Sequence, residues 1–277
     1  MYDFKNKIAL VTGGGGSIGE ALVKALAEAG ARIAVADISL ERAQLTADKV
    51  DGAEAFQVDV TSRASLAAMM DAIHMSLGTV HLVCANAGVN ILGDSITERT
   101  DEDWNFMMNV NVMGAVRTVD AVLPDLRANR PDSYLLLTAS IAGLMVRGHI
   151  PLNIYSVSKF AAVGFGQELR AQFQEEGIGI SMLLPGMVPS GMLQYSTGLR
   201  DRKTVAPIDI DKMVREAPPE HKQFAVSSED CARIALQGIK AGRFYINTHA
   251  DAVERIRKHY EDIVADLSVG GVEPGID

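Results

Sequence analysis

The sequence predicts an α/β fold built on one doubly wound parallel sheet with helices on both faces. Short apolar runs alternate along the chain with longer segments of helical period, a repetition that is typical of parallel strands covered by helices. Runs such as LVCA at 82–85 and YLLLT at 134–138 lack polar alternation, which indicates a sheet buried on both sides. The right-handed crossover rule then favours the doubly wound topology.

The expected elements follow one another without a linker, and no internal repeat occurs beyond the βα unit. Strands are expected within 7–13, 32–38, 54–60, 80–88, 133–140, 179–186 and 243–247. Helices are expected over 20–29, 40–50, 65–77, 104–126, 154–174 and 227–242. Residues 1–277 are thus expected to form a single domain.

Segment 187–226 interrupts the alternation with four prolines, Pro189, Pro207, Pro218 and Pro219. A long insertion of this kind in a compact domain is often a lid, so we expect it to be a substrate-binding loop. The Gly- and Pro-containing end, 268–277, is expected to be either flexible or ordered by a neighbouring subunit.

Composition and charge exclude several classes of function. The formal net charge of -9 leaves no cluster of Lys and Arg for a nucleic acid. No apolar run reaches the roughly 20 residues that cross a bilayer, and no secretory signal begins the chain. Cys84 and Cys231 lie far apart, which suits neither a disulfide framework nor a metal site. We expect a cytoplasmic protein that holds no metal ion. Cys84 is interpreted as a small core residue, and a redox role for it is the alternative.

A glycine-rich turn joins the first strand to the first helix in LVTGGGGSIGEAL, residues 10–22. Such a turn lets a pyrophosphate approach backbone N–H groups and the positive end of the helix dipole. Gly14, Gly16 and Gly19 satisfy G-x-G-x-x-G, but four consecutive glycines make this match easy to obtain, and a simple tight turn is the alternative.

Asp37 stands at the end of the second strand, eighteen residues past Gly19. A carboxylate here can accept hydrogen bonds from an adenosine ribose and repel a 2′-phosphate, which favours NAD over NADP. The alternative is that Asp37 caps the next helix, a position that Ser39 can also fill.

Tyr155 and Lys159 are four residues apart at the start of an expected helix, so their side chains share one face. A phenol, with a pKa of about 10, is a poor base at neutral pH, and an adjacent ammonium favours the phenolate. The two residues can therefore act as a unit.

With this pair the sequence resembles the classical short-chain dehydrogenase/reductase family over nearly the whole chain. The matching residues are Thr12, Gly13, Gly19, Asp59, Val60, Asn86, Ala87, Gly88, Asn111, Ser140, Tyr155, Lys159, Pro185 and Gly186. The resemblance implies a Rossmann fold and hydride transfer between nicotinamide and a carbonyl or secondary alcohol.

The resemblance also implies roles for four catalytic residues. Tyr155 exchanges a proton with the substrate oxygen, which Ser140 orients; Lys159 assists Tyr155 and holds the nicotinamide ribose, and Asn111 anchors a proton-relay water. Ser140 could instead bond a backbone group at the strand end, and Asn111 could merely brace a helix. Asn109 competes for the latter position, but the spacing from Trp104 favours Asn111.

The cofactor contacts implied by the family come from turns at strand ends. They are expected from Gly13, Gly16, Ser17, Ile18, Gly19, Asp37, Asp59, Val60, Asn86, Ala87, Gly88, Tyr155, Lys159, Pro185, Gly186, Val188 and Ser190. Ser17 departs from the pattern, because the family has glycine there. We interpret Ser17 either as part of an S-x-x-E capping box with Glu20 or as a hydroxyl that donates to a phosphate.

The residues expected around the substrate are mostly apolar: Met145, His149, Leu152, Met187 and Met192. They predict a hydrophobic, aromatic or alicyclic secondary alcohol or ketone; His149 could instead be a surface-loop residue. A homodimer or homotetramer is expected through helices 104–126 and 154–174, unless their apolar faces only cover the sheet. The alternatives in function are an NADPH-dependent ketoreductase of acyl-carrier substrates and a non-catalytic NAD-sensing or scaffold protein.

Overall fold

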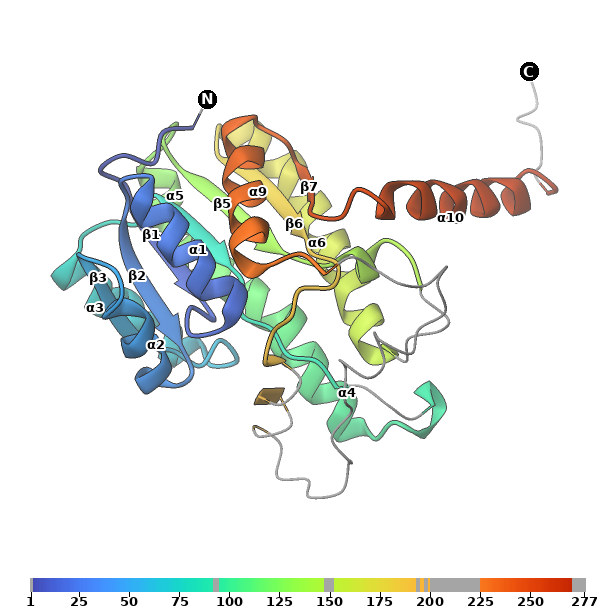
Figure 1. Cartoon of the computed structure of the whole chain (residues 1–277), viewed down its shortest axis with the longest axis horizontal. Helices are drawn as coiled ribbons and strands as arrows, with labels where there is room; N and C mark the ends of the chain where they lie inside the picture. The colour runs from blue at the N-terminus through green and yellow to red at the C-terminus, as the bar shows by residue number, and fades with distance from the viewer. Residues whose placement is uncertain are drawn as a thin grey trace, which may run out of the picture.

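In the described part of the chain, seven parallel strands form one sheet in the order β3-β2-β1-β4-β5-β6-β7 (Figure 1). The computed structural model describes residues 2–91, 95–146, 152–192, 195–196, 199 and 225–270. The strands are β1 (Ile8–Thr12), β2 (Arg32–Asp37), β3 (Ala53–Gln57), β4 (Leu82–Ala85), β5 (Tyr134–Thr138), β6 (Gly179–Leu184) and β7 (Tyr245–Asn247). The chain order reverses between β1 and β4, and this confirms the predicted doubly wound sheet.

Helices cover both faces of the sheet, as predicted. The helices α1 (Ser17–Glu28), α2 (Leu40–Ala47) and α9 (Ser228–Lys240) pack in one apolar cluster. The helices α3 (Arg63–Ser76), α5 (Gly114–Ala128) and α6 (Ile154–Glu176) pack in a second. Strand β1 serves both clusters, because Ala9 faces the first and Leu10 the second. The absence of polar alternation in the strands follows from this double burial.

The carboxyl ends of the strands meet along one edge of the sheet. Strand β1 pairs in register with β2, Thr12 beside Ala36, and with β4, Val11 beside Cys84. The loops that leave β1 and β4 therefore diverge to opposite faces at this edge. In open α/β sheets, such a switch point is where ligands bind.

Local signals fix several helix ends. The hydroxyls of Ser39, Ser62 and Ser227 accept backbone N–H groups at the starts of α2, α3 and α9, as capping serines do. Gly177 ends α6 with φ of 73°, the left-handed conformation that glycine adopts without strain.

The expected helix 104–126 is divided, which corrects the sequence prediction. Helix α4 (Asp101–Met108) passes through a π-helical turn, η2 (Asn109–Met113), before α5 begins at Gly114. A Cβ on Gly114 would lie 2.8 Å from Val60 Cγ2, so the helix approaches the loop after β3 closely here. The extra residue of a π turn changes the direction of the side chains around it, and Asn111 lies within it.

The proposed capping box at Ser17 is wrong. Helix α1 begins at Ser17 itself, Gly16 occupies the N-cap position, and no side chain of the described residues caps this end. Glu20 instead accepts a hydrogen bond from Lys49 Nζ at 2.8 Å. Ser17 is thus a first-turn residue, and its interpretation as a phosphate donor stays a prediction.

Three further elements complete the description: the short 3-10 turns η1 (Ile96–Glu98) and η3 (Ile141–Gly143), and a C-terminal helix, α10 (Ala252–Leu267), which the sequence analysis did not anticipate. Most of the expected loop 187–226, and 271–277 of the expected tail, lie outside the described residues. In the part of the chain that is described, no helix is long and apolar enough to cross a membrane.

Candidate active site

The glycine-rich turn lies at the edge where β1 ends and brings the backbone close to itself. Gly13 has φ of 65°, and a Cβ there would lie 2.9 Å from Ala87 Cα. A Cβ on Gly19 would overlap the Gly13 carbonyl. Because the start of α1 has no side-chain cap among the described residues, its first N–H groups are available to an anion.

Asp37 ends β2 beside this turn and is 5% exposed. Its carboxylate accepts the N–H groups of Gly15 and Ser39, each at 3.1 Å. The N-cap of α2 is Ser39, whose hydroxyl accepts Arg42 N–H. The alternative in which Asp37 caps this helix is therefore excluded, because Ser39 fills that position.

Arg42 is a cation beside Asp37 that the sequence analysis missed. Its guanidinium donates to the Gly15 carbonyl from Nη2 at 2.6 Å and from Nε at 3.1 Å. Its Cζ atom lies 3.9 Å from the centre of the Tyr195 ring, and the Tyr195 hydroxyl donates to Asp37 at 3.5 Å. The positive charge of Arg42, on α2, thus lies against the turn after β1. Arg42 and Gly15 are 27 residues apart in sequence, and no local motif indicates their contact.

The loop after β4 is tied to the end of β1. The Thr12 hydroxyl accepts the N–H groups of Asn86 and Ala87 at 3.1 and 3.2 Å, and Asn86 Nδ2 donates to the Thr12 carbonyl at 3.2 Å. A Cβ on Gly88 would lie 3.3 Å from Asn111 Oδ1 and 3.7 Å from Lys159 Nζ. Gly88 therefore lies between the predicted cofactor turn and two predicted catalytic side chains.

Asn111 is 3% exposed and holds the chain just after Gly88. Its Oδ1 accepts Val89 N–H at 2.8 Å, and its Nδ2 donates to the Val89 carbonyl at 2.9 Å and to Ser158 Oγ at 3.0 Å. Asn109, the competing candidate, accepts a hydrogen bond from Arg117 instead. The π turn thus directs Asn111, rather than Asn109, toward the loop after β4.

Tyr155 and Lys159 lie on one face at the start of α6, as the spacing predicts. Lys159 Nζ is 5.6 Å from the centre of the Tyr155 ring and donates to the Thr138 carbonyl at 3.2 Å. Lys159 is 3% exposed, and burial lowers the pKa of its ammonium to about 8. Burial penalises the charged form, so an ammonium held here without a carboxylate partner among the described residues is unusual.

Ser140 follows β5 and is bonded to backbone groups on both sides. Its hydroxyl donates to the Pro185 carbonyl at 3.2 Å and accepts Ala142 N–H at 3.1 Å. The strand-end bonding that the sequence analysis weighed is therefore present. One acceptor position on the oxygen stays available, so this bonding does not exclude a substrate contact.

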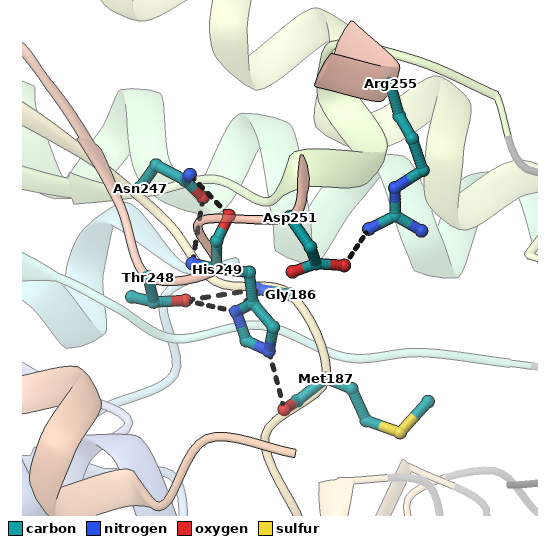
Figure 2. Close-up of polar contacts among 7 residues, drawn as sticks. All are labelled: Gly186, Met187, Asn247, Thr248, His249, Asp251 and Arg255. Atoms are coloured by element: carbon teal, nitrogen blue, oxygen red, sulfur yellow. Dashed lines mark hydrogen bonds and ion pairs between the residues drawn. The ribbon is translucent and has the colours of Figure 1, made fainter. Parts of the chain in front are cut away.

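A histidine after β7 holds the Pro185-Gly186 turn and was missed by the sequence analysis. Figure 2 shows His249 between the Gly186 N–H and the Met187 carbonyl. The His249 Nδ1 atom is 3.2 Å from Gly186 N, and its Nε2 atom is 3.1 Å from the Met187 carbonyl oxygen. Because an amide can only donate and a carbonyl can only accept, Nδ1 must be the acceptor and Nε2 must carry the hydrogen. The Thr248 hydroxyl also lies 2.7 Å from Nδ1.

The other predicted site residues are more dispersed. Asp59 accepts hydrogen bonds from Thr61, Val60 is buried against Gly114, and Val188 and Ile18 pack at the edge of the first apolar cluster. Ser190 is half-buried. The cofactor contacts of these residues stay predictions.

The predicted substrate residues do not all lie in one environment. Met145 is 5% exposed in an apolar cluster with Ile141 and Leu184, whereas Leu152, Met187 and Met192 are half-buried. His149 lies outside the described residues. Substrate contact therefore stays a prediction for all five.

The cysteines are buried free thiols, and burial raises the pKa of each to about 12. Thiols with raised pKa values are poor nucleophiles, which agrees with the interpretation of Cys84 as a core residue. Over the described residues, no group of three His, Cys, Asp or Glu side chains is placed to hold a metal ion.

A dinucleotide fits the residues present at this edge. The close approach of Gly13 and Gly19 forms a cradle that side chains would fill, and the start of α1 presents backbone donors. Asp37 places a buried carboxylate beside this turn, and a carboxylate at the end of the second strand is a suitable acceptor for ribose hydroxyls.

Comparisons with known proteins agree with this arrangement. The family model described as short chain dehydrogenase matches residues 7–199. The chain is 26% identical over 271 residues to a C alpha-dehydrogenase of Sphingobium sp. strain SYK-6, covering 95% of this chain and 87% of that protein. It is 29% identical over 279 residues to a CLA biosynthesis dehydrogenase/reductase of Lactiplantibacillus plantarum, covering 96% of each.

Among solved structures, a short chain dehydrogenase/reductase from Burkholderia phymatum in complex with NAD is similar over 99% of both chains. Its TM-score is 0.85 at 28% sequence identity.

Proposed function

This chain belongs to the short chain dehydrogenase family, and we propose that it is an NAD-dependent oxidoreductase of a hydrophobic secondary alcohol or its ketone. The observation that carries the proposal is the pair on α6, with the buried Lys159 ammonium 5.6 Å from the Tyr155 ring centre and adjacent to Gly88. An unpaired buried cation costs stability, and functional sites are where such a cost is retained.

In the proposed reaction Tyr155 takes the hydroxyl proton of the alcohol, or returns it to the ketone. The positive charge of Lys159 favours the phenolate form that this step requires. The Ser140 hydroxyl turns from the Pro185 carbonyl, to which it donates in this structure, and donates to the same substrate oxygen, which it orients. Nicotinamide, when bound, supplies the acceptor or donor of hydride.

Asn111 contributes by fixing the loop after β4, which lies beside Lys159. Its two amide hydrogens are engaged by Val89 and Ser158, and one Oδ1 lone pair stays available. We assign that lone pair to a water that passes the proton from Tyr155 toward solvent.

The preference for NAD rests on Asp37. Its buried carboxylate accepts two backbone N–H groups at 3.1 Å, so it is held in place to bond a ribose and to repel a 2′-phosphate. The relative from Burkholderia phymatum was solved with NAD, which supports the same choice. Arg42, which donates to the Gly15 carbonyl, is the charge that would favour NADP in the absence of Asp37.

The substrate class rests on the apolar character of the predicted substrate residues. A relative is named as a C alpha-dehydrogenase, which supports dehydrogenation at a carbon centre. We therefore assign an aromatic or alicyclic secondary alcohol as the substrate. We also propose a homodimer or homotetramer as the active form.

The test is fluorescence titration of the purified chain with NADH and with NADPH, followed by NAD-linked oxidation of aromatic, alicyclic and aliphatic secondary alcohols. We expect tighter binding of NADH and turnover of the aromatic or alicyclic alcohols. Tighter NADPH binding would support the ketoreductase alternative. NADH binding without turnover of any alcohol or ketone would support a sensing or scaffold protein.

A further inference from the structure

The C-terminal helix α10 extends away from the rest of the molecule (Figure 1). Its first turn is attached, because Ala252 is fully buried and Ile256 packs against the apolar cluster that contains Phe244. Every residue from Tyr260 to Gly270 is exposed. The helix has 16 residues, and most of the stability of helices in proteins comes from packing of an apolar face.

The exposed part carries an apolar stripe. The apolar residues of the helix, at alternating spacings of three and four, are Val253, Ile256, Tyr260, Ile263 and Leu267, with Val264 beside them. This is the spacing of a coiled-coil seam. Tyr260 is 44% exposed, Val264 64% and Leu267 70%, so the stripe faces solvent along most of its length.

The charges of α10 are divided between its two halves. The first half holds Arg255, Arg257 and Lys258 with a single acid, Glu254, and the second half holds three acids, Glu261, Asp262 and Asp266, without Lys or Arg. Over the described part of the chain, none of these three acids forms an ion pair, whereas Arg255 and Arg257 pair locally with Asp251 and Glu254. The acidic half is thus unneutralised.

This division identifies the partner that fits. A second copy of α10 laid antiparallel would place the basic half of each helix beside the acidic half of the other, and a two-fold axis would make both contacts at once. A parallel copy would place like charges together. A uniformly charged partner would match one half and oppose the other.

We propose that α10 is a dimerisation arm, and that its apolar stripe is covered by α10 of a second copy in antiparallel orientation. Burying the exposed apolar side chains of Tyr260, Ile263, Val264 and Leu267 on each copy would stabilise this contact. This stripe is separate from helices α4, α5 and α6, on which the oligomer was expected from the sequence.

The test is the mass of the full-length chain by sedimentation velocity. We expect Ile263→Asp with Leu267→Asp to halve the mass of the wild-type assembly. The matched control is Ala265→Asp, which adds a charge at the same end of α10 but off the stripe, and it should keep the wild-type mass. Circular dichroism and NADH binding, measured on each variant, establish that the body stays folded.

A charge-reversal experiment tests the orientation. One variant carries Arg257→Glu and Lys258→Glu, and the other carries Asp262→Lys and Asp266→Lys. Each alone should have the halved mass, because both halves of its arms would then carry a net charge of the same sign, and a mixture should recover the wild-type mass. Removal of 271–277 should leave the mass unchanged.

Four outcomes would overturn the proposal. The first is a monomeric wild type, and the second is an unchanged mass in the variant with Ile263→Asp and Leu267→Asp. The third is a mixture of the two charge-reversed variants that does not reassociate. The fourth is a mass that changes when 271–277 is removed, because that segment would then be the occupant of the stripe.

Discussion

Lys159 places a charge in the protein interior, where its ammonium donates a hydrogen bond to the Thr138 carbonyl. Burial lowers its pKa from the ordinary 10.5 to about 8, which corresponds to a cost on the order of 3 kcal/mol in the charged form. We expect Lys159→Met to abolish turnover and to raise the free energy of unfolding at pH 7 by on the order of 1 kcal/mol or more. Urea unfolding of both proteins at pH 7 is the measurement.

The pH dependence of this stability difference follows from the direction of the shift. Between about pH 8 and 10.5 the unfolded chain holds the Lys159 proton that the folded chain has released, so this group makes the wild type more stable as pH rises through that window. Below about pH 8 the full cost is present. The advantage of the methionine variant should therefore shrink from pH 7 to pH 10, and an advantage that grows would contradict the account.

Asp37 and Arg42 oppose each other in the choice of cofactor. Removing the carboxylate in Asp37→Ser leaves Arg42 as the charge nearest the ribose position, so we expect the ratio of NADPH to NADH affinity to rise at least about tenfold, or about 1.4 kcal/mol. Fluorescence titration with both cofactors measures it. In Asp37→Ser combined with Arg42→Ala, the gain for NADPH should disappear. An unchanged ratio in the single variant would mean that Asp37 does not contact the ribose.

At the scale of elements, His249 connects the end of β7 to the turn that follows β6. Its ring bonds both Gly186 and Met187 (Figure 2), so we expect His249→Ala to release this turn and to weaken NADH binding by about tenfold, or about 1.4 kcal/mol, with kcat changed less. His249→Gln, which keeps a donor for the Met187 carbonyl, should recover part of the affinity. If both variants lose the same free energy of unfolding and keep the wild-type NADH affinity, His249 has a structural role only.

The π turn η2 shows which local structure the sequence could not provide. An apolar period near 3.6 continues through 104–126, and one extra residue in a turn barely disturbs it. The turn depends on tertiary contacts, namely the close approach of Gly114 to Val60 and the bonds of Asn111 to Val89. Those contacts join segments that are not adjacent in sequence.

In the molecule as a whole, the sheet and its covering helices could be predicted because the central strands β1, β4 and β5 are buried on both faces. Helices α2, α3, α6 and α9 also have a local start or stop signal. Tyr155, Lys159 and Asp37 were found for a similar reason, since their spacing or strand-end position is visible in the sequence. Arg42 and His249 could not be found, because their roles come from contacts with Gly15 and Gly186, across distances that no motif spans.

Helix α10 was missed on different grounds. Its heptad spacing is present in the sequence, but most of its apolar stripe packs against no other described element of this chain. The proposed role of α10 therefore concerns contacts between copies of the chain, and it is tested by the mass of the assembly rather than by the folding of one chain.

The most direct test of the proposed chemistry compares wild type, Tyr155→Phe and Tyr245→Phe. Tyr245 serves as the control because its hydroxyl is exposed on β7 and bonds Gln167. NADH affinity and NAD-linked oxidation of an aromatic secondary alcohol are measured on all three. The account predicts NADH affinity within about twofold for all three, and turnover lost by a factor of about a hundred or more in Tyr155→Phe alone. Turnover that survives in Tyr155→Phe would contradict the assignment of Tyr155 as the acid and base.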